Sequence, residues 1–284
     1  MNEEQTAKEH LGRLKKVISS YQTTLIAFSG GVDSALVLKV ARDVLGKMHV
    51  KAVTAKSDSL AERELESAKQ FAFACDAEHL VIETREMENP DYVQNPKNRC
   101  YFCKTELYRT LHALLAEHHF QTICNGTNLD DFEDIRPGLS AAHEYGVKSP
   151  LVEAGFRKSD VRAVSHLLGL SVWDKPQSPC LASRIPFGEP VTCEKLSQIE
   201  RGENYLKELG FRQIRLRHFG QKVRLELGTD EFIRVMDADL RNEIVAQVRA
   251  LGFKTVYFEP YQMGRLNHEA PEKNLLAENP SQKQ

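Results

Sequence analysis

The stretch Thr24-Leu-Ile-Ala-Phe-Ser-Gly-Gly-Val-Asp-Ser34 determines the fold. Its first five residues, 24–28, are a short apolar run of the kind that forms a buried strand. Two glycines follow, and the apolar pattern of residues 35–45 indicates a helix. A strand, a tight loop and a helix in this order predict the opening unit of a parallel α/β sheet.

The same alternation continues along the chain. We expect strands at residues 50–55, 79–83 and 122–125, separated by helices at 60–74 and 105–118. Strands spaced by helices of this length predict an α/β fold with a doubly wound parallel sheet, in which ligands bind at the carboxyl ends of the strands. We assign this domain to residues 1–190.

The pattern changes after a segment rich in Pro, Ser and Lys at residues 173–190, which we interpret as a long functional loop. The expected order is then a helix at 194–209, strands at 213–218 and 222–227, a helix at 231–251 and a strand at 255–259. This order predicts a small α+β C-terminal domain at residues 191–267, for substrate binding or oligomerisation, and a polar tail at 268–284.

Composition limits the classes of function. The net charge of −2 gives no overall attraction for nucleic acid, which we therefore do not expect as a partner. The N-terminal residues are charged, and no apolar run approaches the roughly 20 residues that span a bilayer. We expect a cytoplasmic protein with no membrane partner, in which the six cysteines are thiols rather than disulfides.

The glycine loop has the chemistry of a pyrophosphate site. Its backbone N–H groups lie at the positive end of a helix dipole, and its glycines allow close approach to phosphate. It lacks the Gly-Lys-Ser/Thr ending of a Walker loop, so cleavage between the α and β phosphates of ATP is the expected reaction. The competing interpretation is a plain turn in which Asp33 or Ser34 caps the helix. The predicted nucleotide-binding residues are Ser29, Gly30, Gly31, Val32, Asp33 and Ser34, with Asp33 also holding Mg²⁺.

Ser-Gly-Gly-Val-Asp-Ser resembles the signature of the PP-loop ATP pyrophosphatase superfamily, with its adenine nucleotide alpha hydrolase-like fold. This superfamily includes NAD synthetase, GMP synthetase, asparagine synthetase and several tRNA-thiolating enzymes. The resemblance implies that a carboxylate or carbonyl is activated as an adenylate, which a nucleophile then attacks. The nucleophile has to come from elsewhere in the chain.

Three cysteines are candidates for supplying it. Cys100 and Cys103 form a C-x-x-C pair before a predicted helix, and Cys180 lies in the long loop. Three thiolates could hold a 4Fe-4S cluster with one iron open to an exogenous sulfide. Zinc, a redox dithiol and a reactive Cys180 without metal are the alternatives. We interpret Cys75, Cys124 and Cys193 as small packed residues.

Longer motifs resemble one branch of the superfamily, the LarE family of pyridinium-3,5-bisthiocarboxylic acid mononucleotide synthases. They cover most of the chain and lie at residues 29–34, 96–104, 126–131, 134–139, 149–153, 180–188 and 264–267. The resemblance implies adenylylation of a substrate carboxylate and its conversion to a thiocarboxylate, for nickel-pincer cofactor synthesis. It also implies a mononucleotide substrate, a sulfide or other sulfur donor, and a homo-oligomer. Some members sacrifice one cysteine's sulfur, whereas this sequence, with Cys100, Cys103 and Cys180, resembles the three-cysteine members.

The remaining site residues each have a structural alternative. Lys104 is predicted to neutralise phosphate charge, or to be a solvated lysine at a helix start. Gly126, Thr127 and Asp130 follow a strand end and are predicted to contact nucleotide or metal, or to form a capped turn. Arg184 is predicted to act in catalysis on a carboxylate or phosphate, or to form a structural ion pair.

In the C-terminal domain, Arg215 and Arg217 alternate along a strand and project from one face. They are predicted to bind the substrate's monophosphate, or to lie on an exposed charged face. Glu203 and Glu226 resemble acidic positions that the family uses near subunit or metal contacts. The competing functions are a tRNA thiolase, an ammonia-using amidotransferase and a nucleotide-binding regulator.

Overall fold

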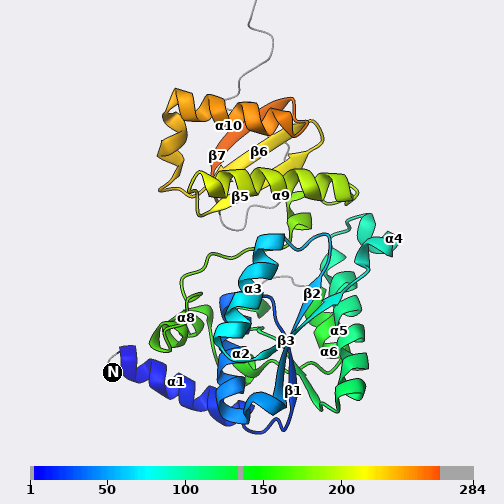
Figure 1. Ribbon diagram of the computed structural model, residues 1–284, viewed down its shortest axis with the longest axis vertical. Coiled ribbons are helices and arrows are strands. Elements are labelled where there is room, and N and C mark those ends of the chain that lie inside the picture. The colour runs from blue at the N-terminus through cyan, green and yellow to red at the C-terminus, as the bar shows by residue number, and fades with distance from the viewer. Residues whose placement is uncertain (1–2, 134–136, 263–284) are drawn as a thin grey trace, which may run out of the picture. The chain divides into compact units, whose positions relative to one another are not determined.

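Strand β1 (Thr24–Ala27) lies inside a four-stranded parallel sheet of order β3-β2-β1-β4 (Figure 1). Its neighbours are β2 (Val50–Lys56) and β4 (Thr122–Cys124), and β3 (Glu78–Glu83) forms the edge beyond β2. The computed structural model describes residues 3–133 and 137–262. The four strands predicted for this domain are confirmed, and their parallel order brings their carboxyl ends to one edge of the sheet.

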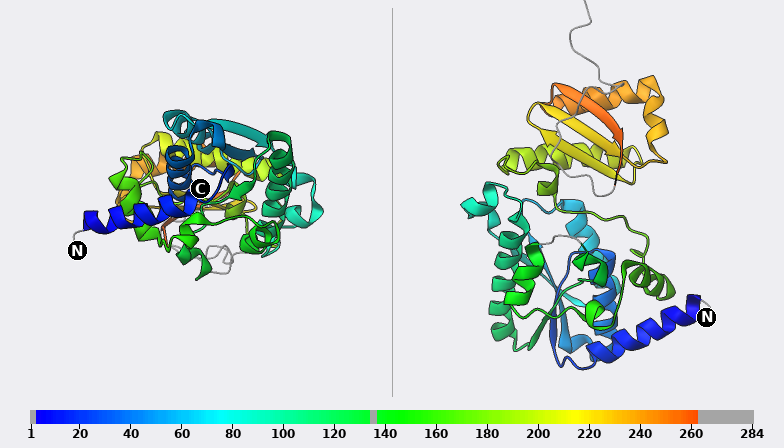
Figure 2. Two further views of the ribbon diagram at one scale, coloured as in Figure 1. Left: turned by 90° about the horizontal axis from the view of Figure 1, so that it is seen from below. Right: turned by 180° about the vertical axis from the view of Figure 1, so that it is seen from behind.

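Helices cover both faces of this sheet, because alternate residues of each strand point to opposite sides. Ile26, Ala52 and Cys124 face one core, and Leu25, Val53 and Ile123 face the other. The first core is closed by α1 (Glu3–Ile18), α2 (Val32–Leu45), α3 (Glu62–Ala74), α7 (Pro150–Glu153) and α8 (Lys158–Leu167). The second is closed by α5 (Arg99–His118) and α6 (Pro137–Glu144). The doubly wound α/β fold is therefore confirmed, and Figure 2 shows the two helical layers from other sides.

The C-terminal part forms a separate small α+β unit, as predicted. Its sheet has the order β5-β6-β7, with β5 (Ile214–Phe219) antiparallel and β7 (Thr255–Pro260) parallel to β6 (Lys222–Leu227). Helices α9 (Cys193–Glu208) and α10 (Ala238–Ala250) contribute Leu196, Ile199, Ile244 and Val248 to the buried residues of the unit. This unit also contains two short 3-10 segments: η4 (Leu181–Arg184), which precedes α9, and η5 (Phe232–Met236), which precedes α10.

Internal contacts divide the chain into two units. The first comprises Met1–Asn89 and Asn98–Ser178, and the second comprises Pro90–Lys97 and Pro179–Gln284. Pro90–Lys97, which includes α4 (Pro90–Val93), joins the second unit because Asn95 Nδ2 donates to the carbonyl oxygens of Ile185, Pro186 and Glu189. The boundary predicted at residue 190 stays a prediction, and residues 268–284 lie outside the described part of the chain.

Two helices, α5 and α10, differ most from the predicted ones at their N-termini. The helix predicted at 231–251 is interrupted, because the Asp237 carboxylate accepts a hydrogen bond from Leu240 N–H (2.8 Å) and caps α10 there. Helix α5 begins at Arg99, six residues before the predicted start, so the C-x-x-C pair lies at the N-terminal end of the helix rather than before it. Helices α6, α7 and α8 were not predicted. In residues 3–133 and 137–262 no helix is both long and apolar enough to cross a membrane.

Candidate functional site

The loop Ser29–Ser34 joins the carboxyl end of β1 to α2. Gly30 has a φ of +70°, which favours glycine, and a β-carbon there would lie 3.1 Å from the β-carbon of Ala68. Ser34 Oγ accepts a hydrogen bond from Ser29 N–H (3.2 Å) and lies 3.1 Å from Ser29 Oγ. The N-cap of α2 is Gly31, which makes no side-chain capping bond. Neither Asp33 nor Ser34 is thus the N-cap of α2, so that part of the competing interpretation is wrong, and the binding of nucleotide by this loop stays a prediction.

Gly126 brings a second loop directly onto this one. A β-carbon at residue 126 would lie 2.6 Å from the amide nitrogen of Ser34, so only glycine fits. Asn125 holds this second loop in place. Its Oδ1 accepts hydrogen bonds from Thr127 N–H (3.0 Å) and from Ser149 Oγ (2.9 Å). Gly126 and Thr127 thus lie beside the glycine loop, where they were predicted, and their contact with nucleotide stays a prediction.

Asp33 is the acidic residue of the glycine loop, and it contacts the second loop. Its Oδ1 accepts a hydrogen bond from Asn128 Nδ2 (3.1 Å), and its Oδ2 is paired with Lys158 Nζ. The carboxylate is about one-fifth exposed. A hard oxygen donor fixed at the rim of the glycine loop suits Mg²⁺, which keeps several waters and takes one or two carboxylates. Asp33 therefore fits the magnesium position that the sequence predicts for it.

Asp130 anchors the start of α8 to the same loop. Its carboxylate accepts from Lys158 N–H (2.8 Å) and from Arg157 Nη1 (2.7 Å). The Lys158 N–H bond, with the Arg157 guanidinium, lowers the pKa of Asp130. These contacts make Asp130 an anchor for α8, and its predicted contact with nucleotide or metal stays a prediction.

Lys175 links the glycine loop to helix α3. Its Nζ donates to the Gly30 carbonyl oxygen (3.2 Å) and pairs with Glu64 of α3 (2.8 Å). Lys175 lies at the start of the segment that leads to Cys180. Neither lysine nor Asn128 was predicted as a site residue, although Asn128 lies in the quoted motif 126–131.

Helix α5 carries Lys104, Cys100 and Cys103. The cysteines are three residues apart at its N-terminal end, where such side chains are neighbours, with Cys100 exposed and Cys103 half-buried. The Lys104 side chain lies against Gly138 of α6, where a β-carbon would be 3.0 Å from Lys104 Cγ. This close approach accounts for the glycine at position 138 in the motif at residues 134–139. Asp134, Ile135 and Arg136 of that motif lie outside the described residues, and so does the motif at residues 264–267.

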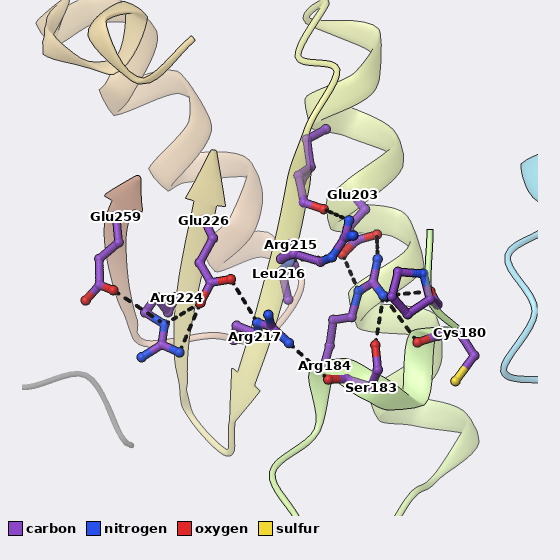
Figure 3. Close-up of polar contacts among 12 residues, drawn as sticks. Cys180, Ser183, Arg184, Glu203, Arg215, Leu216, Arg217, Arg224, Glu226 and Glu259 are labelled. Carbon is purple, nitrogen blue, oxygen red and sulfur yellow. Dashed lines mark hydrogen bonds and ion pairs between the residues drawn. The ribbon is translucent and has the colours of Figure 1, made fainter. Parts of the chain in front are cut away.

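Cys180 occupies a turn held by Arg184 (Figure 3). The thiol side chain is exposed, and Arg184 Nη1 donates to the carbonyl oxygens of Pro179 (2.7 Å) and Cys180 (3.2 Å). Arg184 is 1% exposed and pairs with both carboxylate oxygens of Glu203 on α9 (2.8 and 3.0 Å). Burial alone would raise the pKa of Glu203, but the charge and hydrogen bonds of Arg184 hold that pKa below its usual value. Arg184 thus forms the structural ion pair that is the alternative to a catalytic group, and its catalytic action stays a prediction.

The ionic cluster continues across the small sheet. Arg217 pairs with Glu226 (3.0 Å) and donates to the Ser183 carbonyl oxygen (3.1 Å), while Arg224 lies between Glu226 and Glu259. Arg215 and Arg217 are 6% and 8% exposed, so the interpretation as an exposed charged face is wrong. Burial, and next the nearby charge of Arg184, lower the pKa of Arg215 to about 10. Figure 3 shows that the guanidinium and carboxylate groups of this cluster alternate across β5, β6 and β7.

The other cysteines divide into two kinds. Cys124 is buried in β4, where burial raises the pKa of its thiol to about 12, and burial also raises the pKa of the half-buried Cys75. Cys193 is exposed at the first turn of α9, directly after the capping residue Thr192, so its interpretation as a packed residue is wrong.

The three candidate ligand thiols belong to different units. Cys100 and Cys103 lie in the first and Cys180 lies in the second. No group of three His, Cys, Asp or Glu side chains suited to a metal is present in the described ranges, 3–133 and 137–262. Chemically the donors fit an iron-sulfur cluster, because none of the three thiols is in a disulfide and a thiolate is the ligand that such clusters take.

Comparisons with known proteins agree with these features. Residues 8–106 match the family described as NAD synthase. The chain is 45% identical over 259 residues to an uncharacterized protein of Synechocystis sp., covering 90% of this chain and 96% of that one. It is 35% identical over 258 residues to the pyridinium-3,5-bisthiocarboxylic acid mononucleotide synthase of Lactiplantibacillus plantarum, covering 89% and 92%. An uncharacterized protein of Methanocaldococcus jannaschii is 25% identical over 232 residues, covering 82% and 87%.

The likeness to the Lactiplantibacillus synthase extends through both units. The chain belongs to the LarE family, the family of pyridinium-3,5-bisthiocarboxylic acid mononucleotide synthase, and its first unit has the PP-loop fold of the NAD synthase type.

Proposed function

We propose that this protein is an ATP-dependent sulfurtransferase. It adenylylates a carboxylate of pyridinium-3,5-biscarboxylic acid mononucleotide and converts that group to a thiocarboxylate, for nickel-pincer nucleotide synthesis. The observation that carries the proposal is the exposed Cys180 thiol on a turn held by the buried Arg184–Glu203 pair, in a chain that also has a glycine loop at the start of α2. Its family relationship supplies the substrate class.

In the first half-reaction, a substrate carboxylate oxygen attacks the α-phosphorus of ATP and the bond to the β-phosphate oxygen breaks. The N–H groups of the glycine loop and the α2 dipole receive the pyrophosphate. Asp33, oriented by Asn128, is the residue that would hold Mg²⁺, and the metal would supply positive charge to screen the phosphates. Lys104 adds a positive charge near the developing phosphate charge.

In the second half-reaction, sulfur attacks the carbonyl carbon of the adenylate and AMP leaves, so that a thiocarboxylate remains. Cys100, Cys103 and Cys180 are the residues that would hold a 4Fe-4S cluster. Such a cluster, held by three thiolates, has one iron available for an external sulfide. The task of Arg184 is to fix the backbone at Cys180, since it binds two carbonyl oxygens there.

The same turn also suits a sacrificial reaction, which is the alternative. Here the Cys180 thiolate attacks the adenylate carbonyl and forms a thioester as AMP leaves. Loss of the Cys180 α-proton with cleavage of its Cβ–S bond then gives thiocarboxylate and dehydroalanine. Cys100 and Cys103 have no part in that route.

The C-terminal unit provides a place for the substrate's phosphate. Arg215 and Arg217 are both buried on β5, and a guanidinium binds phosphate with two parallel hydrogen bonds. We assign them to the monophosphate of the substrate. We also expect a homo-oligomer, which sedimentation analysis would test.

The deciding experiment uses protein prepared without oxygen and supplied with iron and sulfide. Wild type is expected to bind iron and sulfide and to form thiocarboxylate together with AMP and pyrophosphate. Cys103→Ala should lose the iron and the product, whereas Cys193→Ser, which changes another exposed thiol, should lose neither. Pyrophosphate release without thiocarboxylate in wild type would contradict the proposal. Product with loss of one sulfur from the chain mass would establish the sacrificial route. Tight tRNA binding at physiological salt would favour a tRNA thiolase instead.

A further inference from the structure

Lys158 makes an ion pair with Asp33 across 125 residues of sequence. It is the first residue of α8, and its Nζ pairs with Oδ2 of Asp33, which lies in the first turn of α2. Both side chains are about one-fifth exposed, so the pair lies at the rim of the glycine loop rather than in the core. This lysine has no place in the reaction as described above.

The pair engages the carboxylate that is assigned to Mg²⁺. Asn128 already occupies Oδ1, so Lys158 holds the remaining oxygen. An ammonium group and a divalent cation repel each other at contact distance. Lys158 therefore competes electrostatically with a metal ion for Asp33, so that binding of either cation weakens binding of the other.

The backbone at Lys158 stays fixed when its side chain moves. Lys158 N–H donates to Asp130 Oδ2 (2.8 Å), and Arg157 Nη1 donates to Asp130 Oδ1 (2.7 Å). Arg157 N–H in turn donates to Asp160 Oδ2 (2.8 Å). None of these bonds uses the Lys158 ammonium. The side chain is thus a flexible four-carbon arm on an anchored helix start, beside a loop built for phosphate.

We propose that Lys158 is a positioning residue that exchanges partners during the reaction: it gives up Asp33 when Mg²⁺ binds and then pairs with a phosphate oxygen of ATP, and afterwards of pyrophosphate. The phosphate ligand in this inference rests on the proposed function. The exchange keeps the charge of Asp33 neutralised in both states. It also links metal binding to phosphate binding, because the ammonium freed by the metal is the one that the phosphate uses.

A merely structural ion pair would behave differently, and the chain offers a matched control. Lys51 Nζ pairs with Glu78 Oε1 (2.6 Å) between β2 and β3, at the opposite edge of the sheet from the glycine loop. Lys51→Met removes an ion pair of similar length from the same domain and leaves the loop untouched.

The test measures binding by calorimetry and needs no turnover. Lys158→Met should bind Mn²⁺ alone about three- to ten-fold more tightly than wild type, because the competing cation is gone. It should bind pyrophosphate in saturating Mg²⁺ about ten-fold or more weakly, because a charged hydrogen bond is lost. Lys158→Arg should restore part of the pyrophosphate affinity, and Lys51→Met should change neither constant.

Opposite changes in the two affinities are the signature of exchange. Weaker binding of both ligands, or no change in either, would overturn the inference. In an Asp33→Asn background the gain in Mn²⁺ affinity should vanish, and its persistence would likewise overturn it. Wild type that binds Mg-pyrophosphate but makes no thiocarboxylate would refute the sulfurtransferase and leave this exchange standing. Wild type that binds no pyrophosphate would refute the exchange itself.

Discussion

Gly126 lies so close to Ser34 that a β-carbon on it would be 2.6 Å from the Ser34 amide nitrogen. Gly126→Ala therefore has to push the second loop away from the glycine loop, or move the start of α2. Overpacking of this kind destabilises a domain by about 1–3 kcal/mol. We expect a lower melting temperature and a markedly weaker affinity for ATP, measured by thermal unfolding and calorimetry.

Gly12 provides the control for that substitution. It lies exposed in the interior of α1, and a β-carbon on it would meet no atom within 4 Å. Gly12→Ala should leave ATP affinity unchanged and stabilise the chain by about 0.5–1 kcal/mol, because alanine favours the helix. Unchanged ATP binding in Gly126→Ala would show that the two loops separate without consequence.

Asn128→Ala should weaken Mg²⁺-dependent ATP binding about ten-fold, because Asp33 Oδ1 loses the donor that orients it, a charged hydrogen bond. Asn128 also caps the short segment η3 (Leu129–Phe132), so a loss of stability is expected as well. Thr192→Ala, which removes the cap of α9, separates the two effects. It should cost about 1 kcal/mol of stability without changing ATP binding. Equal ATP affinity in both variants would contradict the orienting action of Asn128.

Arg184→Met should unfold the C-terminal unit more easily, by about 3–5 kcal/mol, because it leaves the Glu203 carboxylate buried without its partner. Adding Glu203→Met should restore much of this stability, since a buried pair often exchanges for apolar side chains without loss. The Cys180 turn would still lack the donor to its two carbonyl oxygens. The double variant should therefore be stable but slow in thiocarboxylate formation, and a fully active double variant would contradict the positioning of Cys180 by Arg184.

His218 makes the stability of the C-terminal unit depend on pH. Its Nδ1 accepts from Gly220 N–H (3.2 Å) and its Nε2 donates to Gln198 Oε1 (3.0 Å), so the ring is neutral. Burial, with the charge of Lys195, lowers its pKa to about 4. The unfolded chain binds a proton near pH 6.5 and the folded chain does so only near 4, so stability falls as the pH drops through this window. The loss reaches about 3 kcal/mol.

His218→Gln tests this dependence. Glutamine does not titrate, so unfolding midpoints measured between about pH 7 and pH 4.5 should fall less steeply in the variant than in wild type. Parallel curves for the two proteins would show that His218 does not cause the acid sensitivity.

The strands were predictable because each is a short apolar run bounded by turn residues, and the observed ends differ from the predicted ones by one residue at most. The glycine loop was predictable because all its residues, 29–34, are consecutive in the sequence, so the motif can be recognised without knowledge of the fold. Helix α8 was missed because its apolar residues Val161 and Val164 stand among charged ones. Without α8 there was no sign that Lys158 would meet Asp33.

The arginines of the C-terminal unit show a different limit. The alternation of Arg215 and Arg217 correctly placed both on one face of a strand, but charged residues on a strand look the same whether they are exposed or buried. Arg217 is buried together with its partner Glu226 of the next strand, and Glu226 lies opposite Arg215 in the register. A single sequence does not state that register.

The junction between Ser178 and Pro179 affects how such enzymes can diversify. A genetic crossover at this junction would transfer Cys180 together with Arg184, which holds the Cys180 turn, while the recipient kept its own glycine loop. Cys100 and Cys103 would stay behind, so recombinants between one-cysteine and three-cysteine members would inherit an incomplete thiol set. The incoming segment would also have to accept Asn95, which the recipient supplies. Under the proposed function, such a crossover would separate the candidate cluster thiols from one another but would leave the glycine loop intact.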